Sequence, residues 1–537
     1  MRKNTLKIKL ISVPGLDPLM PKILYMPFGI STISSLLKRE NYEVIKEDLN
    51  VSMINNASRL FHLKNIFTIQ SMRNPEKLSE HLFQKSYHYK FEEYITNVIS
   101  LENYKDFDVF GLSALSHEAL IFALLFAQLL RRNYPDKIIV LGGAYLSIIK
   151  DRYFNKLPYI DFIIHGRGDY PMLKLMDYVS HGKGNIEHID GLIYRDGKGH
   201  IYVNKAYDDD LNEEPIPDYD GFDFDSYKGY LEPELGKDGY NLSIPYRTNI
   251  GCVRRCNFCD YRRVHGSYKE KDVDKIVNEA EILSKKYKSP YFHLVDSALN
   301  NNPKKLQEFC LKLLERKLNL RWHGYMRATN ISKKLLQLMK QAGAFHLRWG
   351  IESGNSEVLK YIGKGYNRAQ AIEALDLAYE VGFKNTILII IGEPYERINH
   401  VQDTLSLLKR YVNNKNINYH IYNLKLISDS PLFIEPGKFN IKNIQPIGNT
   451  NADFIYFNRT GYQYDETYGL KWEDRQKLTV KLSNYFFDEL YKAEREKGVK
   501  RSLPISFYVW RRNFLEESYL LCYIFQLVMR KQVKYVS

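Results

Sequence analysis

The sequence predicts an α/β protein in which a doubly wound parallel sheet is followed by an open, partial (βα)6 barrel. Residues 1–205 and 241–435 both alternate short apolar runs with amphipathic helical patterns. This alternation is typical of parallel sheets covered by helices. Between them, residues 206–240 are acidic, interrupted by prolines and without hydrophobic periodicity. We therefore expect a linker on the surface there, and a boundary between two domains.

In the first domain, short apolar runs predict a central sheet. Helical spacing of apolar residues predicts helices over 29–40 and 117–132. A polar, mostly helical insertion at 51–105 interrupts the alternation. The expected strands are 6–13, 43–47, 108–114, 137–141 and 160–165.

The second domain repeats a strand followed by a helix six times. Six right-handed units curl into an open barrel, and ligands then bind at the carboxyl ends of its strands. Residues 436–537 are expected to form a mainly helical C-terminal extension. The expected strands are 246–250, 291–295, 320–326, 344–350, 386–391 and 419–426, and the helices are 273–286, 304–315, 333–342, 368–380 and 401–411.

Charge and composition exclude several classes of protein. The chain has 77 Lys and Arg against 63 Asp and Glu, but it contains no dense basic tract, so we do not expect a nucleic-acid partner. Lys9 and Pro14 break the first apolar stretch, which argues against a signal peptide. The apolar run at 519–529 is shorter than the roughly 20 residues that span a bilayer, so no membrane span is expected.

The five cysteines do not form a disulfide framework. Three of them lie within the segment NIGCVRRCNFCDYRR after the first barrel strand, whereas Cys310 and Cys522 are isolated. This distribution indicates a reducing, cytoplasmic location, with the two isolated cysteines as core thiols.

Cys252, Cys256 and Cys259 have the spacing C-x3-C-x2-C. Three thiolates on an iron–sulfur cluster leave one iron open to a chelating molecule. Structural zinc sites and ferredoxin clusters use four ligands. His265 is the nearest candidate for a fourth ligand, so a Cys3His zinc site is the alternative.

CVRRCNFC, with Phe258 before the last cysteine, resembles the signature of the radical S-adenosylmethionine superfamily. The resemblance implies a [4Fe-4S] cluster on Cys252, Cys256 and Cys259, with S-adenosylmethionine on the open iron and Phe258 packed on the adenine. It also implies no catalytic residue beyond the cluster ligands.

Four later segments resemble the S-adenosylmethionine-binding segments of that superfamily, in the same order along the strands. They are YFHLVDSALN, HGYMRATN, FHLRWGIESGN and TILIIIGEPYE. Taken singly, their acidic residues could be helix N-caps and the arginine a surface ion pair. The resemblance assigns cofactor binding to Asp296, Arg327, Glu352, Ser353 and Gly392.

The first domain resembles the cobalamin-binding domain of one branch of the superfamily, which implies a Rossmann-like fold before a TIM-like radical barrel. The similar segments are DVFGLSALSHE, IVLGGAYLS and YIDFIIHGRGDYPMLKL. Glycine at the carboxyl ends of parallel strands allows backbone to approach a large flat ligand. The residues expected to bind cobalamin are Ser113, Ser116, Gly142, Gly143, Gly166 and Gly168.

The sequence departs from that branch at two points. Arg167 and Asp169 stand where two glutamates are usual, and the motif Asp-x-His-x-x-Gly, which places a histidine below cobalt, is missing. His117 is the histidine nearest the expected cobalt-facing loop. Its position after Ser116 is also that of an ordinary residue at a helix start.

The resemblance implies reductive cleavage of S-adenosylmethionine to a 5′-deoxyadenosyl radical and cobalamin-dependent methylation of an unactivated carbon. The substrate would be a small molecule or a peptide, and the electron donor a flavodoxin or ferredoxin. One alternative is radical cyclisation or rearrangement without methyl transfer, and another is a non-catalytic iron–sulfur or zinc protein. Transfer-RNA modification is disfavoured because no cysteine precedes Cys252.

Overall fold

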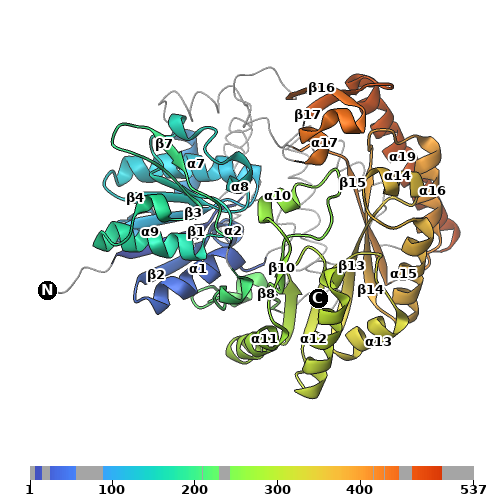
Figure 1. Cartoon of the computed structure of the whole chain (residues 1–537), viewed down its shortest axis with the longest axis horizontal. Helices are drawn as coiled ribbons and strands as arrows, with labels where there is room; N and C mark the ends of the chain where they lie inside the picture. The colour runs from blue at the N-terminus through green and yellow to red at the C-terminus, as the bar shows by residue number, and fades with distance from the viewer. Residues whose placement is uncertain are drawn as a thin grey trace.

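The computed structural model describes residues 6–14, 25–55, 89–208, 210–228, 242–414, 416–427, 430–446 and 462–498. Two sheets lie side by side in it (Figure 1). Parts of the expected insertion, linker and C-terminal extension, together with Cys522, lie outside the described residues. In the part that is described, no helix is both long enough and apolar enough to cross a membrane.

The first sheet has seven strands in the order β2-β1-β3-β4-β5-β6-β7. Strands β1 to β5 are parallel, and β6 and β7 add an antiparallel hairpin at one edge. The strands are β1 (Lys7–Ser12), β2 (Glu43–Asp48), β3 (Val109–Ser113), β4 (Ile138–Gly142), β5 (Phe162–Ile164), β6 (Leu192–Arg195) and β7 (Ile201–Val203).

Helices cover both faces of this sheet, as expected for a doubly wound fold. Along β1, Ile8 and Leu10 pack in the same apolar cluster as residues of α1 (Phe28–Arg39) and α9 (Asp169–His181). Ile11 instead packs with the cluster that contains α7 (His117–Asn133) and part of α6 (Tyr89–Thr96). Alternate residues of a strand point to opposite faces, so this sheet is buried on both sides.

The second sheet is wholly parallel, with six strands in the order β15-β14-β13-β12-β11-β8. The sheet forms an open barrel: its two edge strands, β8 and β15, do not pair with each other. The strands are β8 (Ile244–Tyr246), β11 (Tyr291–Leu294), β12 (Arg321–Met326), β13 (Ala344–Glu352), β14 (Lys384–Ile391) and β15 (Ile417–Asn423).

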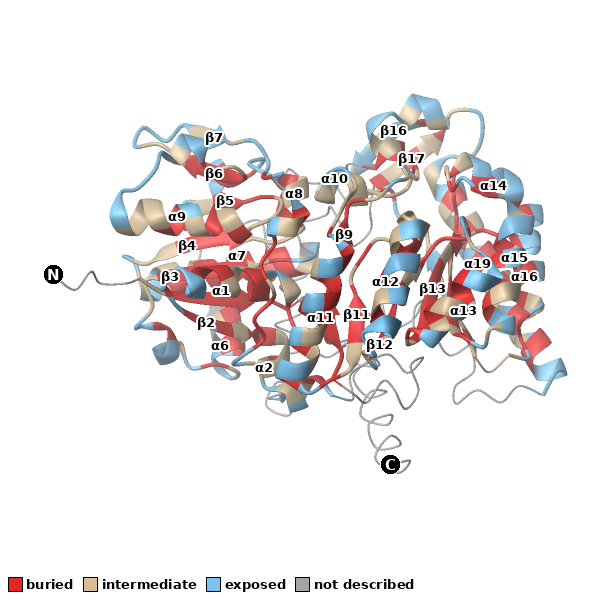
Figure 2. Ribbon diagram, turned by 60° about the horizontal axis from the view of Figure 1, so that its bottom comes forward, coloured by how far each residue is buried: buried red, intermediate tan, exposed pale blue. Residues whose placement is uncertain are grey.

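The barrel helices lie outside the strands with their outer faces exposed, while the strands are buried (Figure 2). After the last strand, an antiparallel hairpin of β16 (Ile441–Pro446) and β17 (Tyr462–Glu466) precedes a long helix, α19 (Trp472–Glu496), which packs on α16. The outer helices are α11 (Val273–Tyr287), α12 (Pro303–Glu315), α13 (Lys333–Gln341), α15 (Arg368–Glu380) and α16 (Ile398–Lys409).

Two expectations from the sequence were wrong in detail. The first barrel strand ends at Tyr246, whereas the pattern predicted a strand over 246–250; Asn249–Ile250 instead pairs antiparallel with β10 (Lys269–Glu270). The linker was expected on the surface, but Tyr219 and Glu214 in it are 0% and 1% exposed. An acidic segment can be buried in this way because basic side chains neutralise its charges.

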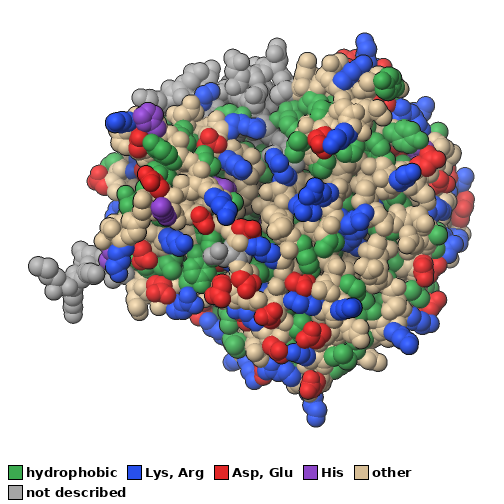
Figure 3. Space-filling view, in the orientation of Figure 1, with side chains coloured by type: hydrophobic (Ala, Val, Ile, Leu, Met, Phe, Trp, Pro, Cys, Tyr) green, Lys and Arg blue, Asp and Glu red, His purple; other side chains and the backbone are tan. Residues whose placement is uncertain are grey.

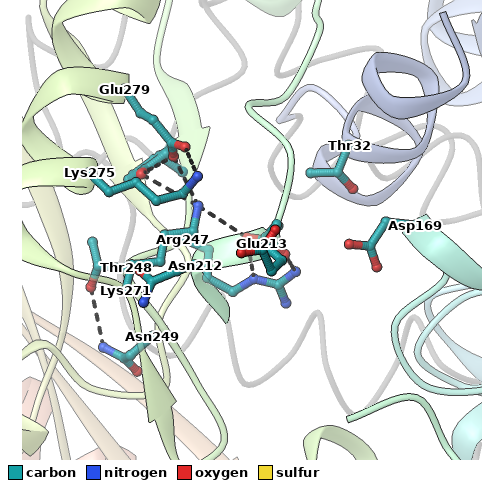
Figure 4. Close-up of polar contacts among 12 residues, drawn as sticks. Thr32, Asp169, Asn212, Glu213, Arg247, Thr248, Asn249, Lys271, Lys275 and Glu279 are labelled. Atoms are coloured by element: carbon teal, nitrogen blue, oxygen red, sulfur yellow. Dashed lines mark hydrogen bonds and ion pairs between the residues drawn. The ribbon is translucent and has the colours of Figure 1, made fainter. Parts of the chain in front are cut away.

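A buried charge network joins the linker to the barrel (Figure 4). Glu214 forms ion pairs with Arg247, which follows β8, and with Lys271, which follows β10, the latter at 3.2 Å. Lys271 also contacts Glu279 of α11 at 3.1 Å, and Lys275 lies 2.8 Å from the same carboxylate. Burial alone would raise the pKa of the Glu214 carboxyl. The positive charges of Arg247 and Lys271 have the larger effect, so the pKa is lowered.

The linker is tied to the first sheet as well. The Asp218 carboxylate lies 2.9 Å from the Nζ atom of Lys46 in β2, and the Asp218 amide donates to the carbonyl of Ser31 in α1 at 3.0 Å. On the barrel side, the neighbouring Tyr219 amide donates to the Tyr287 hydroxyl at 2.8 Å. The linker therefore fixes the two sheets relative to each other.

Replacing Lys271 with Met should lower the free energy of unfolding by about 3–5 kcal/mol, because two buried carboxylates lose a shared cation. The measurement is urea unfolding followed by tryptophan fluorescence, since Trp322 and Trp349 are buried in the barrel. The matched control is Lys333→Met, which breaks an exposed pair with Glu380 and should cost less than about 1 kcal/mol. Equal effects of the two substitutions would contradict the prediction.

Candidate functional site

The three cysteines of the motif lie on the loop between β9 (Asn249–Ile250) and α10 (Tyr261–His265). This loop follows the carboxyl end of β8. All three are free and partly exposed. The Cys259 amide donates to the Cys256 carbonyl at 3.1 Å, and the Tyr261 amide donates to the Cys259 Sγ atom at 3.4 Å. Burial raises the pKa of the Cys259 thiol to about 12, so a metal that binds here has to displace a proton.

Asp296, after β11, fixes the start of the cysteine loop. Its Oδ1 atom accepts hydrogen bonds from the amides of Thr248 and Asn249 at 2.8 and 3.0 Å, and its Oδ2 atom accepts from the Thr248 hydroxyl. The next residue, Ser297, donates to the Gly251 carbonyl at 2.7 Å. Asp296 is 2% exposed, and burial raises its pKa to about 6.

Gly251, directly before the first cysteine, has to be a glycine. Its φ is +73°, and a Cβ atom there would lie 2.3 Å from the Ser267 carbonyl oxygen. The loop therefore crosses another backbone segment at a distance that leaves no space for a side chain.

Residues 362–365, which follow α14 (Ser356–Tyr361), pack against the cysteine loop. The Asn257 amide donates to the Ile362 carbonyl at 3.1 Å. A Cβ atom on Gly363 would lie 3.9 Å from the Cys256 Cα atom, and the Cys256 Sγ atom lies 4.0 Å from the Gly363 carbonyl oxygen.

Two of the predicted cofactor-binding residues come together beside Cys256. The Arg327 guanidinium donates to the Lys364 carbonyl at 2.7 Å, and the Lys364 Nζ atom lies 3.2 Å from the Glu352 carboxylate. Lys364 and Arg327 both act to lower the pKa of the Cys256 thiol, whereas burial raises it. Lys364 was not among the residues predicted from the sequence, although its flanking glycines were a signal of close backbone packing.

Three other predicted residues already have structural partners. Ser353 is 1% exposed, lies 3.2 Å from the Thr404 hydroxyl and accepts the Asn355 amide at 3.2 Å. Gly392, with φ +95°, leaves space for α19, because a Cβ atom there would lie 2.7 Å from Thr479. Phe258 packs on apolar clusters of both sheets. Their contact with S-adenosylmethionine, and that of Asp296, stays a prediction.

The loops expected to bind cobalamin lie together at the carboxyl ends of β3, β4 and β5. Gly143 has φ +107°, and a Cβ atom there would lie 2.3 Å from the Ala114 carbonyl oxygen. Gly166 has φ +81° and open space around its Cα atom. The remaining residues are Ser113 at the end of β3, Gly142 at the end of β4 and Gly168 before α9.

Ser116 has a local structural role. It is the N-cap of α7, and its hydroxyl accepts the Ala119 amide at 3.2 Å. Arg167 and Asp169, which replace the usual glutamates, form a buried ion pair at 2.8 Å. His117 begins α7, as expected of an ordinary residue at a helix start.

The carboxyl ends of the two sheets face each other. Helix α8 (Leu146–Ile149), which follows β4, contacts α10, which follows the cysteine loop (Figure 1). The predicted cobalamin loops and the predicted cluster loop therefore lie on opposite sides of one interface.

A Cys3His zinc site does not fit this geometry. Among the described residues, no group of three or more His, Cys, Asp and Glu lies close enough to hold a single ion. His265 instead contacts the ring of Tyr261, with centroids 4.2 Å apart. A [4Fe-4S] cluster fits better because its ligand sulfurs bind different iron atoms and need not converge on one point, and because Arg327 and Lys364 supply positive charge beside the thiolates.

Residues 246–408 match the family model of the radical SAM superfamily. The chain is 26% identical over 307 residues to an uncharacterized methyltransferase of Pyrococcus horikoshii, covering 57% of this chain and 64% of the relative. It is 27% identical over 338 residues to the anaerobic magnesium-protoporphyrin IX monomethyl ester cyclase of Rubrivivax gelatinosus, covering 62% of this chain and 58% of the relative. The chain thus spans less than two thirds of the length of these relatives.

The fold resembles that of the cobalamin-dependent S-adenosylmethionine radical enzyme OxsB, solved with aqua-cobalamin and S-adenosylmethionine bound. The TM-score is 0.62 at 17% identity, over 92% of this chain and 70% of OxsB. Residues 246–408 therefore match a radical SAM domain, and the chain as a whole shares the fold of OxsB.

Proposed function

We propose that this enzyme methylates an unactivated carbon of a small-molecule or peptide substrate in a cobalamin-dependent radical reaction. The observation that carries the proposal is the contact between α8 and α10, since it brings the glycine-rich ends of β4 and β5 opposite the cysteine loop. The name of the methyltransferase relative supports methyl transfer, and the name of OxsB supports a cobalamin-dependent radical reaction.

Bound here, a [4Fe-4S] cluster supplies the electron that cleaves S-adenosylmethionine to a 5′-deoxyadenosyl radical, and cobalamin supplies the methyl group. Cys252, Cys256 and Cys259 would hold the cluster and leave one iron open. Arg327 and Lys364 would balance the negative charge of the thiolates, and Glu352 would orient Lys364 through their ion pair. The buried interface would exclude water from the reacting atoms.

An acidic electron-transfer protein, such as a flavodoxin or ferredoxin, fits the surface around the cysteines. The segment CVRRCNFCDYRR contains four arginines and one aspartate, and Arg255 and Arg263 are exposed. Figure 3 shows Lys and Arg side chains gathered on this face around the position of α10. Such a patch speeds the approach of an anionic partner.

A second candidate function is radical cyclisation without methyl transfer. The similarity to a cyclase favours it, as do Arg167 and Asp169, whose buried pair replaces the usual glutamates. The mass of the product separates the two candidates, because only methylation adds a methyl group.

Anaerobic reconstitution with iron, sulfide and hydroxocobalamin should give a chain that retains corrin absorbance after desalting. Addition of S-adenosylmethionine and dithionite should then release 5′-deoxyadenosine, because the open iron binds and reduces the cofactor. Release of 5′-deoxyadenosine without retained corrin would favour the second candidate, and no release would refute both.

Replacing Cys252, Cys256 or Cys259 with Ala should abolish cluster iron and 5′-deoxyadenosine formation together. Cys310→Ala is the matched control, because that thiol is buried in α12 away from the loop, and it should retain both. Iron content and product are measured after identical reconstitution. Retained cleavage of S-adenosylmethionine in any of the three loop variants would contradict the assignment of these cysteines as cluster ligands.

Asp296→Asn should reduce the iron bound per chain. An amide oxygen can replace only part of the carboxylate, so at least one buried donor of the loop loses its partner, at a cost of about 1–3 kcal/mol. Iron per chain after reconstitution tests this, with Asp274→Asn on the exposed surface of α11 as the control. An iron content equal to that of the control would show that Asp296 does not support the loop.

A further inference from the structure

Three histidines form a layer inside the barrel that the proposed function does not use. His293 of β11 pairs in register with His323 of β12, and His323 pairs with His346 of β13. The rings of His293 and His323 are stacked, with centroids 4.8 Å apart and planes 3° apart, and the His323 and His346 centroids are 6.0 Å apart. We call these three residues the histidine layer.

The histidine layer faces the interior of the barrel. The neighbouring Trp322 contacts Phe309 of the outer helix α12, so its side chain points outward. Alternate residues of a strand point to opposite faces, so His323 points inward. The three histidines are 9%, 0% and 0% exposed.

Two of these histidines lack polar partners. His346 contacts the Thr386 hydroxyl at 2.9 Å. Both ring nitrogens of His293 and both of His323 have no hydrogen-bond partner among the described residues. Burial lowers the pKa of His293 to about 3 and that of His323 well below its usual value, so each ring is neutral, with one donor and one acceptor.

Unpaired groups of this kind are costly. A buried polar group without a partner destabilises the folded protein, and native proteins keep few of them without a ligand or ordered water. Two adjacent rings with four such nitrogens therefore offer hydrogen-bond donors and acceptors to a polar ligand in this part of the barrel.

The charges of the same face favour an anion. Along the six barrel strands, the only acidic residue is Glu352, at the carboxyl end of β13. The basic residues Arg321, Arg348 and Lys384 each lie two residues from His323, His346 or Thr386 and share their inward face. The strands thus contribute basic side chains and no carboxylate to this part of the interior, and each of the three basic side chains also has an interaction of its own.

We infer that the histidine layer binds an anionic group of the substrate, a phosphate, phosphonate or carboxylate, through the ring N–H groups of His293 and His323. This inference rests on the proposed function, since it names the class of substrate that the radical site modifies. Arg327, beside Cys256, lies four residues beyond His323, which is about 13 Å along a strand. The substrate therefore has to be long enough to carry a reactive carbon at roughly that distance from its anionic group.

The test uses the reconstituted full chain and inorganic pyrophosphate as the probe, with binding measured by calorimetry at constant ionic strength. The wild-type chain should bind pyrophosphate saturably below about 10 mM, an affinity that a few hydrogen bonds supply. His293→Phe and His323→Phe keep ring shape but remove the donors, and each should raise the Kd at least tenfold. His188→Phe, on the exposed surface of the first domain, is the matched control and should leave the Kd unchanged.

His293→Gln and His323→Gln keep a donor and an acceptor, and should raise the Kd less than the Phe variants. Cluster iron in each variant reports whether the barrel has assembled.

A second measurement needs no variant: a crystal of the wild-type holoenzyme soaked in pyrophosphate should show density within hydrogen-bond distance of both rings.

Absence of saturable binding, an unchanged Kd in the Phe variants, or density only elsewhere would overturn the inference. Formation of 5′-deoxyadenosine is assayed in parallel on the wild type. Pyrophosphate binding through the histidine layer without 5′-deoxyadenosine would overturn the proposed function and not the anion site, so the two failures are distinguishable.

Discussion

One buried carboxylate, that of Glu214, ties the linker to the start of the barrel, where the cysteine loop begins. It lies between Arg247 and Lys271, and through Lys271 it reaches Glu279 of α11. Arg247 also lies over the ring of Phe28, the first residue of α1, at 4.9 Å. Since charges buried in this way are stable only when all partners are present, the network fixes the linker, the first barrel strand and the first sheet together.

Arg247 is followed directly by Thr248 and Asn249, which Asp296 holds. Two neighbouring polar clusters therefore determine where the cysteine loop begins. The carboxyl ends of parallel strands meet at one edge of a sheet, and here both sheets direct that edge toward the same interface. The fold thus brings loops from two independent sheets together at one interface, where α8 contacts α10.

Local patterns in the sequence predicted much of this arrangement. Alternating apolar runs located most strands to within about two residues, and the spacing of three cysteines in eight positions was enough to indicate the loop. The order of segments after the later strands also led to Arg327 and Glu352, which lie together beside Cys256.

Long-range contacts could not be predicted in the same way. Lys364 joins Glu352 only because the chain turns back after α14, and no periodicity indicates this. The acidic linker has the composition of a surface segment, and its burial is explained by basic partners far away in sequence, namely Lys46 of β2, Arg247 after β8 and Lys271 after β10. The β6–β7 hairpin was not predicted, because strands of four and three residues are too short to give a recognisable alternation of apolar and polar residues. The histidine layer was also missed, because its members are far apart in sequence and become neighbours only through the register of three strands.

Tyr25, which precedes α1, packs against His293 inside the barrel, with ring centroids 4.2 Å apart and planes tilted by 37°. One wall of the barrel interior is therefore supplied by a residue from before the first helix of the other domain. A chimaera that kept residues 241–537 and replaced the preceding domain would lose this wall together with the partners of Arg247. The two domains therefore depend on each other for packing inside the barrel, and exchanging side chains within the barrel should disturb the fold less than exchanging a whole domain.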